Sequence, residues 1–211
     1  MLFLCSPGNP TAKAIPLDDI KQIAGSPEAQ NTLVVVDEAY VDFSDKGSAI
    51  SILAEYPNVV VLQTLSKAFG LAAIRCGFCM GAPDVIQLMN NVKAPYNVNV
   101  LTSKLAISAF DSIHVLNDHI KTTLEERAMV AAELNKLEFV VEVFPSDSNF
   151  LLVRLTDKAL KVYKTMADGG VVVRFRGNEN HCNECLRITI GTPEENKTML
   201  ARIQDVYASL G

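Results

Sequence analysis

The chain contains 211 residues, 49% of them hydrophobic, and carries a formal net charge of −5. This composition allows a substantial core, in one large domain or in a domain and a half. The negative charge and the lack of Lys/Arg clusters argue against nucleic acid and anionic membranes as partners. No apolar run reaches the roughly 20 residues of a membrane span, and the start lacks the basic region of a signal peptide. The odd number of cysteines, 5, suits a reducing compartment, so we expect a cytoplasmic protein.

The first part of the chain predicts the α/β class. Four short apolar runs are continuous rather than alternating, which is typical of strands covered on both faces: 2–5, 33–36, 59–62 and 77–80. Helices are predicted between the first three runs, over 16–24 and 48–56. This β-α-β-α-β order indicates a mainly parallel, doubly wound sheet, in which ligands bind beyond the carboxyl ends of the strands. Asn9, Asp37 and Lys67 lie at or just past those ends.

The remainder of the chain predicts further helices and a small α/β domain. Helices are expected over 84–92, 100–110, 114–137 and 157–167, and strands over 139–144, 149–155, 171–173 and 186–190. Thr192 and Glu195 fit a capping box with Pro193 at the first position of a last helix that ends near residue 209. We therefore expect a partial large domain over 1–112, a bridging helix over 113–137 and a small C-terminal domain over 138–211.

Two C-x-x-C pairs, Cys76/Cys79 and Cys182/Cys185, raise the question of a metal site. A zinc ribbon brings such pairs within ~15–20 residues of each other, whereas about a hundred residues separate them here. Cys76 to Cys79 fits a buried strand, where a thiol behaves as a small hydrophobe. We expect no metal.

The stretch around Lys67 suits a cofactor that carries both a carbonyl and a phosphate. A lysine amine can form a Schiff base with such a carbonyl. Thr64 and Ser66 can donate hydrogen bonds to phosphate oxygens, and Arg75 can add a planar, permanently charged fork. A Ser-Lys pair alone is commonplace, so the assignment depends on the rest of the chain.

A second group of side chains suits the ring of a pyridine cofactor. Asp37 could keep the ring nitrogen protonated, which makes the ring an electron sink. Tyr40 and Asn9 could hydrogen-bond the 3-oxygen of that ring. Each also has a plain structural interpretation: Asp37 as a helix cap, Tyr40 as core, and Asn9 with Pro10 as a turn.

In order and approximate spacing, these residues resemble the pyridoxal-phosphate-dependent class I/II aminotransferases of fold type I. The segments most similar to the histidinol-phosphate aminotransferase subfamily are 37–43, 64–71, 75–77, 171–174 and 185–191. The resemblance runs the whole chain. It implies the fold of the C-terminal part of such an enzyme, with pyridoxal 5'-phosphate as the cofactor.

The resemblance also assigns roles by position. It makes Lys67 the Schiff-base lysine and general base, and Asp37 the partner of the ring nitrogen. The remaining cofactor contacts would come from Tyr40 and Asn9 on the 3-oxygen and from Thr64, Ser66 and Arg75 on the phosphate. Arg187 would hold the phosphate of the substrate, with Arg174 as a helper; a surface charge is the alternative for Arg174.

The implied reaction is amino transfer between histidinol phosphate and the glutamate/2-oxoglutarate pair, in histidine biosynthesis. A related aromatic aminotransferase, a threonine-phosphate decarboxylase and an inactive truncated remnant are the alternatives. Members of the family form homodimers and have an additional N-terminal half, so we expect a truncated chain. Ala12 stands where relatives have Gly, and a positive φ there would cost about 1 kcal/mol.

Overall fold

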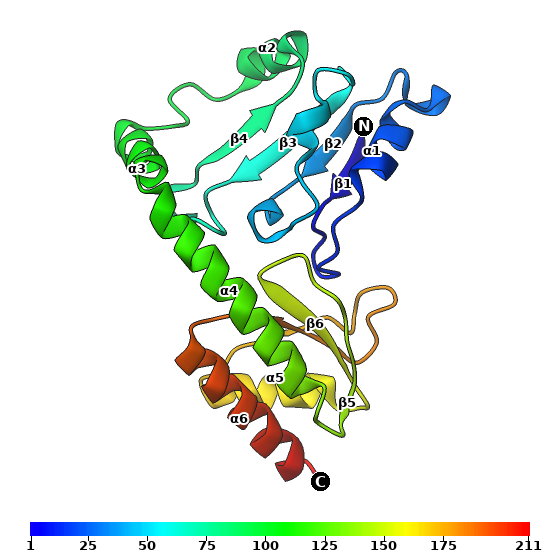
Figure 1. The fold of residues 1–211 in the computed structure, drawn as a ribbon, viewed down its shortest axis with the longest axis vertical. Helices are drawn as coiled ribbons and strands as arrows, with labels where there is room; N and C mark the ends of the chain where they lie inside the picture. Colours follow the sequence, from blue (N-terminus) through cyan, green and yellow to red (C-terminus); the bar gives the residue numbers. More distant parts are fainter. The chain divides into compact units, whose positions relative to one another are not determined.

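The computed structural model describes residues 1–211 and divides into two compact units (Figure 1). The first unit comprises residues 1–8 and 13–119, and the second comprises residues 9–12 and 120–211. Helix α4 (Ile113–Leu134) continues from the first unit into the second. The sequence-based division into a partial large domain, a bridging helix and a small domain stays a prediction.

The first unit is built on a four-stranded sheet in the order β1-β2-β3-β4. Its strands are β1 (Leu2–Cys5), β2 (Val34–Asp37), β3 (Val59–Thr64) and β4 (Gly77–Met80). The first three pair in parallel, and β4 runs antiparallel to β3. The predicted mainly parallel α/β sheet is confirmed, with an antiparallel strand at one edge. Cys5, Asp37 and Leu62 lie in register, so the carboxyl ends of the parallel strands meet at one edge of the sheet.

The central strands of this sheet are valine-rich because they are buried on both faces. Val34 and Val36 share one face with their register partners on β3, and helix α1 (Leu17–Ala24) covers that face through Ile20 and Ala24. The acidic first turn of α1 complements the positive end of its dipole.

The edge strands do not follow the predicted burial. Phe3 on β1 is 60% exposed and Phe78 on β4 is 40% exposed. Continuous apolar runs therefore predicted these strands correctly but not how far other elements cover their side chains.

The helix predicted over 48–56 is wrong. The structure has a 3-10 turn, Ala49–Ile52, followed by turns. The Ser48 hydroxyl accepts a hydrogen bond from the Ile50 amide, and the Ser51 hydroxyl donates to the Ser48 carbonyl. Such local bonds compete with the α-helical pattern.

Two helices complete the first unit ahead of α4. Helix α2 (Pro83–Val92) begins with proline, and α3 (Val100–Asp111) is capped by the Asn99 side chain, which accepts from the Thr102 amide. No residue of α2 is buried. None of the helices of the chain combines the length and hydropathy needed to cross a bilayer.

The second unit is an antiparallel sheet in the order β5-β6-β8-β7, with helices α5 and α6 and the later turns of α4. The strands are β5 (Val140–Val143), β6 (Phe150–Leu155), β7 (Arg174–Phe175) and β8 (Cys185–Thr189), and the helices are α5 (Ala159–Asp168) and α6 (Pro193–Ser209). Leu151, Val153, Leu186 and Ile188 form one core with apolar side chains of all three helices. Because side chains alternate along a strand, the other face carries Arg154 and Arg187 with their register partners.

The start of α6 confirms the predicted capping box. The Thr192 hydroxyl accepts from the Glu195 amide at 3.3 Å, and Glu195 Oε2 accepts from the Thr192 amide at 2.8 Å. The strand predicted over 171–173 is wrong: the Val171 amide still donates to the Met166 carbonyl, and Gly170 turns the chain with φ +84. The strand starts at Arg174 instead.

Ala12, which stands where relatives have glycine, does have a positive φ. Its φ is 63 and its side chain is fully buried, while its carbonyl accepts from the Asp147 amide at 2.7 Å. A left-handed backbone at a non-glycine residue costs about 1 kcal/mol, which the surrounding contacts offset.

Candidate functional site

The ends of β2 and β3 bring the predicted lysine and phenol together. Lys67 Nζ lies 5.2 Å from the centre of the Tyr40 ring. Tyr40 is buried at the start of a 3-10 turn, three residues after Asp37, which ends β2. Asp37 Oδ1 accepts from the Ala39 amide at 3.1 Å. An amine, a phenol and a carboxylate thus come from two neighbouring strand ends.

The hydroxyl pair that precedes Lys67 is a fixed turn. Thr64 Oγ1 and Ser66 Oγ are hydrogen-bonded at 2.9 Å, and the Ser66 amide donates to Thr64 Oγ1 at 3.1 Å. Leu65 between them is buried, and its amide donates to the Cys76 carbonyl. The buried leucine anchors the turn, so the two hydroxyls keep their mutual geometry.

Arg75 precedes Cys76, whose carbonyl is bonded to this turn, but no hydrogen bond joins Arg75 to the two hydroxyls. It has a left-handed backbone with φ 53, is exposed, and donates from Nη1 to the Ala72 carbonyl at 3.1 Å. Its neighbour Cys76 supplies the carbonyl that holds Leu65. The guanidinium is therefore available for an anion, and its predicted role stays a prediction.

Glu38 is a residue that sequence reasoning missed. It is 3% exposed and accepts hydrogen bonds from the Ser48 hydroxyl and the Ala49 amide, each at 2.6 Å, and from Gln63 Nε2 at 2.9 Å. These bonds join the end of β2 to β3 and to the 3-10 turn. The signal was a second carboxylate directly after Asp37 in an apolar segment. Burial raises the pKa of the nearby Asp42 carboxyl, and the charge of Glu38 adds to this rise.

The second unit groups the other predicted residues. Arg187 Nη1 donates to Asn9 Oδ1 at 2.7 Å, and its guanidinium carbon lies 5.0 Å from the centre of the Phe150 ring. Arg174 on β7 is the direct register partner of Arg187 on β8. Like charges opposite each other destabilise a sheet. An anion bound by both would relieve that repulsion.

The nine predicted residues therefore divide between the units. Asp37, Tyr40, Thr64, Ser66, Lys67 and Arg75 lie in the first unit, and Asn9, Arg174 and Arg187 lie in the second. The structure joins Lys67 to Tyr40, Thr64 to Ser66, and Asn9 to Arg187. The functional groups in the first unit fit a phosphorylated pyridine aldehyde: one amine, one carboxylate, one phenol, two hydroxyls and one guanidinium.

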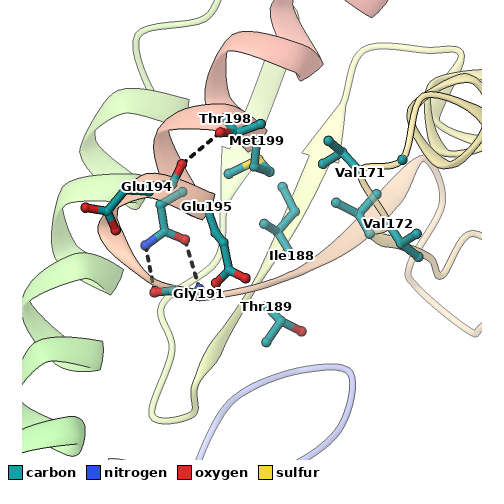
Figure 2. A pocket seen from close by; sticks show the side chains of 12 residues that line it. Val171, Val172, Ile188, Thr189, Gly191, Glu194, Glu195, Thr198 and Met199 are labelled. Carbon is teal, nitrogen blue, oxygen red and sulfur yellow. Dashed lines mark hydrogen bonds between the residues drawn. The ribbon is translucent and has the colours of Figure 1, made fainter.

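A cavity of about 470 Å³ in the second unit contains none of these residues. It lies between residues 170–173, the end of β8 and the first turns of α6 (Figure 2). Asn196 forms part of its wall, bonded to both the amide and the carbonyl of Gly191 and, from Nδ2, to Glu126 at 2.8 Å. These bonds hold the start of α6, so the polar wall of the cavity has a structural function.

Comparison with known proteins extends over nearly the whole chain. The family "Aminotransferase class I and II" matches residues 1–203. The chain is 42% identical over 204 residues to a histidinol-phosphate aminotransferase of Bacteroides fragilis, covering 97% of this chain and 58% of that protein. It is 44% identical over 222 residues to the Schizosaccharomyces pombe enzyme of that name, covering 97% and 57%. The chain thus spans well under two thirds of the length of these curated relatives.

The chain also matches solved structures in its fold. A histidinol-phosphate aminotransferase from Sinorhizobium meliloti in complex with pyridoxal-5'-phosphate matches with a TM-score of 0.86 at 27% identity, over 99% of this chain and 57% of that one. An L-threonine-O-3-phosphate decarboxylase from Porphyromonas gingivalis matches with a TM-score of 0.81 at 23% identity, over 98% and 64%, a likeness in fold alone. The fold predicted from the sequence is confirmed by these matches.

Proposed function

This chain belongs to the class I and II aminotransferase family, and we propose that it supplies the catalytic lysine region of an enzyme that transfers an amino group between histidinol phosphate and 2-oxoglutarate. The observation that carries the proposal is the position of the Lys67 amine against the Tyr40 ring, directly after the Thr64/Ser66 hydroxyl pair. The names of relatives more than 40% identical support the substrate.

The residues of the first unit fit pyridoxal phosphate, which supplies an electron-accepting ring when bound. Lys67 would hold the carbonyl carbon of the cofactor and then move the proton at the α-carbon of the substrate. Asp37 would hold the proton of the ring nitrogen, and Tyr40 would donate to the 3-oxygen. Thr64, Ser66 and Arg75 would bind the phosphate.

The contact between Asn9 and Arg187 adds a constraint to this assignment. A guanidinium only donates hydrogen bonds, so the amide of Asn9 must present its oxygen to Arg187. The Asn9 NH₂ group is then the part that faces away and can donate to the 3-oxygen of the ring.

Arg187 and Arg174 would bind the phosphate group of the substrate. They are register partners on adjacent strands, so their side chains leave the same face of the sheet. The phosphate would interact with two positive charges at once, which favours a phosphorylated substrate over an uncharged one.

A threonine-phosphate decarboxylase is the second candidate, since a protein of that name shares the fold. A related aromatic aminotransferase is a further alternative. Amine substrates with and without a phosphate separate the aromatic enzyme from the other two, and release of CO₂ identifies the decarboxylase. We further propose a homodimer and a cytoplasmic location, the latter because all five cysteines are free.

The test is the attachment of the cofactor. We expect pyridoxal phosphate added to this chain to give, after borohydride, a stable adduct on the tryptic peptide that contains Lys67. Lys67→Ala should lose the adduct, and Lys104→Ala, a change at an exposed lysine of α3, should keep it. An adduct that persists in Lys67→Ala and maps to another lysine would overturn the assignment.

A further inference from the structure

The turn before β8 holds two cysteines in a position to bond to each other. The Cys185 amide donates to the Cys182 carbonyl at 3.0 Å, which closes a four-residue turn. The first and last Cα atoms of such a turn lie within about 7 Å, and disulfides usually span about 4.4–6.8 Å. Both side chains are buried in one cluster with Leu152 and Phe144. The two thiols therefore lie on the same side of the turn.

The other C-x-x-C pair has the same spacing and the opposite geometry. Cys79 lies within β4, and Cys76 is the residue just before that strand. Along a strand, residues three apart are separated by about 10 Å and face opposite sides. Cys76 packs with Leu65 and Ala106, whereas Cys79 Sγ lies 3.4 Å from Met89 Sδ. The pair Cys76/Cys79 is therefore an internal control: it has the same spacing as Cys182/Cys185 but a geometry that does not allow a disulfide.

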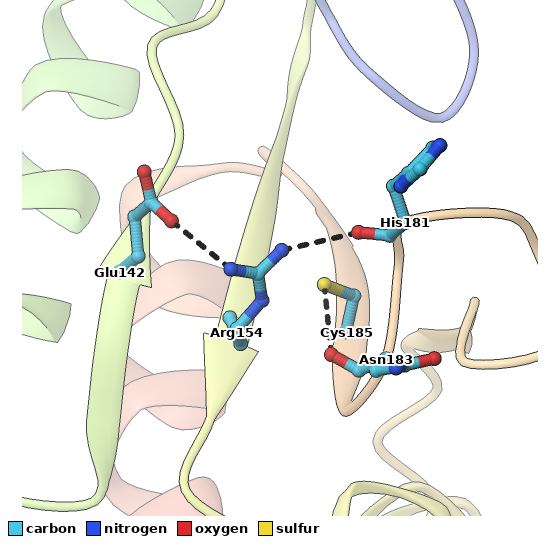
Figure 3. Close-up of polar contacts among 5 residues, drawn as sticks. All are labelled: Glu142, Arg154, His181, Asn183 and Cys185. Atoms are coloured by element: carbon cyan, nitrogen blue, oxygen red, sulfur yellow. Dashed lines mark hydrogen bonds and ion pairs between the residues drawn. The ribbon is translucent and has the colours of Figure 1, made fainter.

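An arginine lies against the second pair. Arg154 on β6 is the register partner of Cys185, and its guanidinium contacts the Glu142 carboxylate at 3.4 Å and the His181 carbonyl at 3.1 Å (Figure 3). Burial raises the pKa of the Cys185 thiol, and Arg154 acts in the opposite direction by favouring the thiolate. Arg154 therefore holds the turn through His181 and supplies a positive charge that acts on the Cys185 thiol.

The backbone around the pair is under local strain. His181 and Glu184 have φ values of 62 and 54, both left-handed, and His181 and Asn183 are exposed. A left-handed conformation costs a non-glycine residue roughly 1–2 kcal/mol. Opening of this exposed turn would relieve that strain and would give a small oxidant access to the buried thiols.

We propose that Cys182 and Cys185 form a redox-sensitive dithiol that a peroxide converts to a disulfide. The Cys185 thiol loses its proton, and the thiolate attacks one oxygen of hydrogen peroxide. The O–O bond breaks, Cys185 becomes a sulfenic acid, and the departing hydroxide takes up the proton and leaves as water. The Cys182 thiol then attacks that sulfur and displaces a second water as the S–S bond forms. Two thiols and one peroxide give one disulfide and two waters. The new bond clamps the chain two residues before Arg187, and a cellular thiol reverses it.

Mass spectrometry tests this on the full chain, because trypsin separates the cysteines into three peptides: 1–13, 76–93 and 177–187. After mild peroxide treatment and blocking of free thiols, peptide 177–187 should carry no blocking group and should have lost two hydrogens. Peptides 1–13 and 76–93 should be fully blocked, and dithiothreitol should restore the thiols of 177–187. Equal blocking of peptides 76–93 and 177–187 would overturn the proposal.

Two variants make the order of events testable. Cys182→Ser should stop at a sulfenic acid on Cys185, detected as a dimedone adduct. Arg154→Met should slow disulfide formation at least several-fold, because it removes the charge that favours the thiolate. A dimedone adduct on peptide 76–93 alone, or an unchanged rate in Arg154→Met, would contradict the proposed mechanism. The wild-type peptide analysis decides the proposal even where a variant folds poorly.

Discussion

The two units of this chain differ in how fully they cover their own apolar side chains. In the second unit, helices α4, α5 and α6 bury one face of the sheet, and Leu186, Ile188 and Ile203 are at most 1% exposed. In the first unit, β1 and β4 are open edges, and Val92 on α2 and Leu101 on α3 are 84% and 73% exposed. Contiguous exposed apolar surface marks an interaction site or an association liability. The second unit thus buries most of its apolar side chains itself, although Val141 and Val172 stay exposed, whereas the first leaves more large apolar side chains of its helices uncovered.

The largest expected effect follows from this difference. The matched relatives extend well beyond the part that this chain spans. We expect the 211-residue chain alone to bind pyridoxal phosphate far more weakly than a complete relative, to transaminate negligibly, and to bind a hydrophobic dye or aggregate. The measurements are cofactor titration, turnover with histidinol phosphate, and dye fluorescence. Turnover equal to that of a complete relative, from a homogeneous preparation, would show that the exposed surface of the first unit has no functional consequence.

Arg187→Ala should act on the second unit without disturbing cofactor attachment in the first. Removing one partner of a charge-assisted pair costs roughly 2–5 kcal/mol, or tens to thousands-fold in affinity. Calorimetry should therefore show much weaker binding of histidinol phosphate, with the borohydride-stable adduct on Lys67 retained. Arg187→Lys should recover only part of the loss, because a point charge replaces a planar fork.

The opposite result would be equally informative. Loss of the cofactor adduct in Arg187→Ala, with unchanged affinity for histidinol phosphate, would assign this arginine to the cofactor. The hydrogen bond to Asn9 would then be its main function.

Glu38→Gln should destabilise the first unit by about 2–3 kcal/mol. The buried carboxylate accepts three hydrogen bonds. In the variant, the NH₂ group of the amide would face groups that also donate, so at least one of these hydrogen bonds would be lost. Chemical denaturation should shift the unfolding of the first unit and leave that of the second unchanged. Asp45→Asn, a change at an exposed carboxylate of the same unit, is the control and should shift neither transition.

Features that depend on residues close together in the sequence were predicted, whereas features that depend on contacts between distant residues were not. The strands β2 and β3 were predictable because runs of valine define them locally, and so was the Thr64–Lys67 stretch, whose groups are contiguous. The antiparallel direction of β4 was not predictable, since an apolar run does not indicate whether a strand pairs in parallel or antiparallel. The bond between Asn9 and Arg187 joins residues 178 positions apart, and nothing in the local pattern indicates it.

Burial was the least predictable property. The apolar run at β1 is as continuous as that at β2, yet Phe3 is exposed and Val35 is buried. The difference arises from which face of each strand other elements cover, which is a property of the whole fold. Glu38 was missed for a related reason: its three donors come from segments that are brought together only by the fold.

The smallest expected effect concerns the second unit and a feature that is local in sequence. Thr192→Ala removes the hydroxyl that accepts from the Glu195 amide, and loss of such a cap costs about 1 kcal/mol. Denaturation should therefore show a lower midpoint for the second unit only, the mirror image of Glu38→Gln. Thr192→Ser keeps the oxygen and should restore most of the stability, whereas Thr198→Ala, a change six residues further along at an exposed position of α6, should have little effect. If both units lose stability together in Thr192→Ala, they unfold as one cooperative body, and the independence inferred from their different covering is wrong.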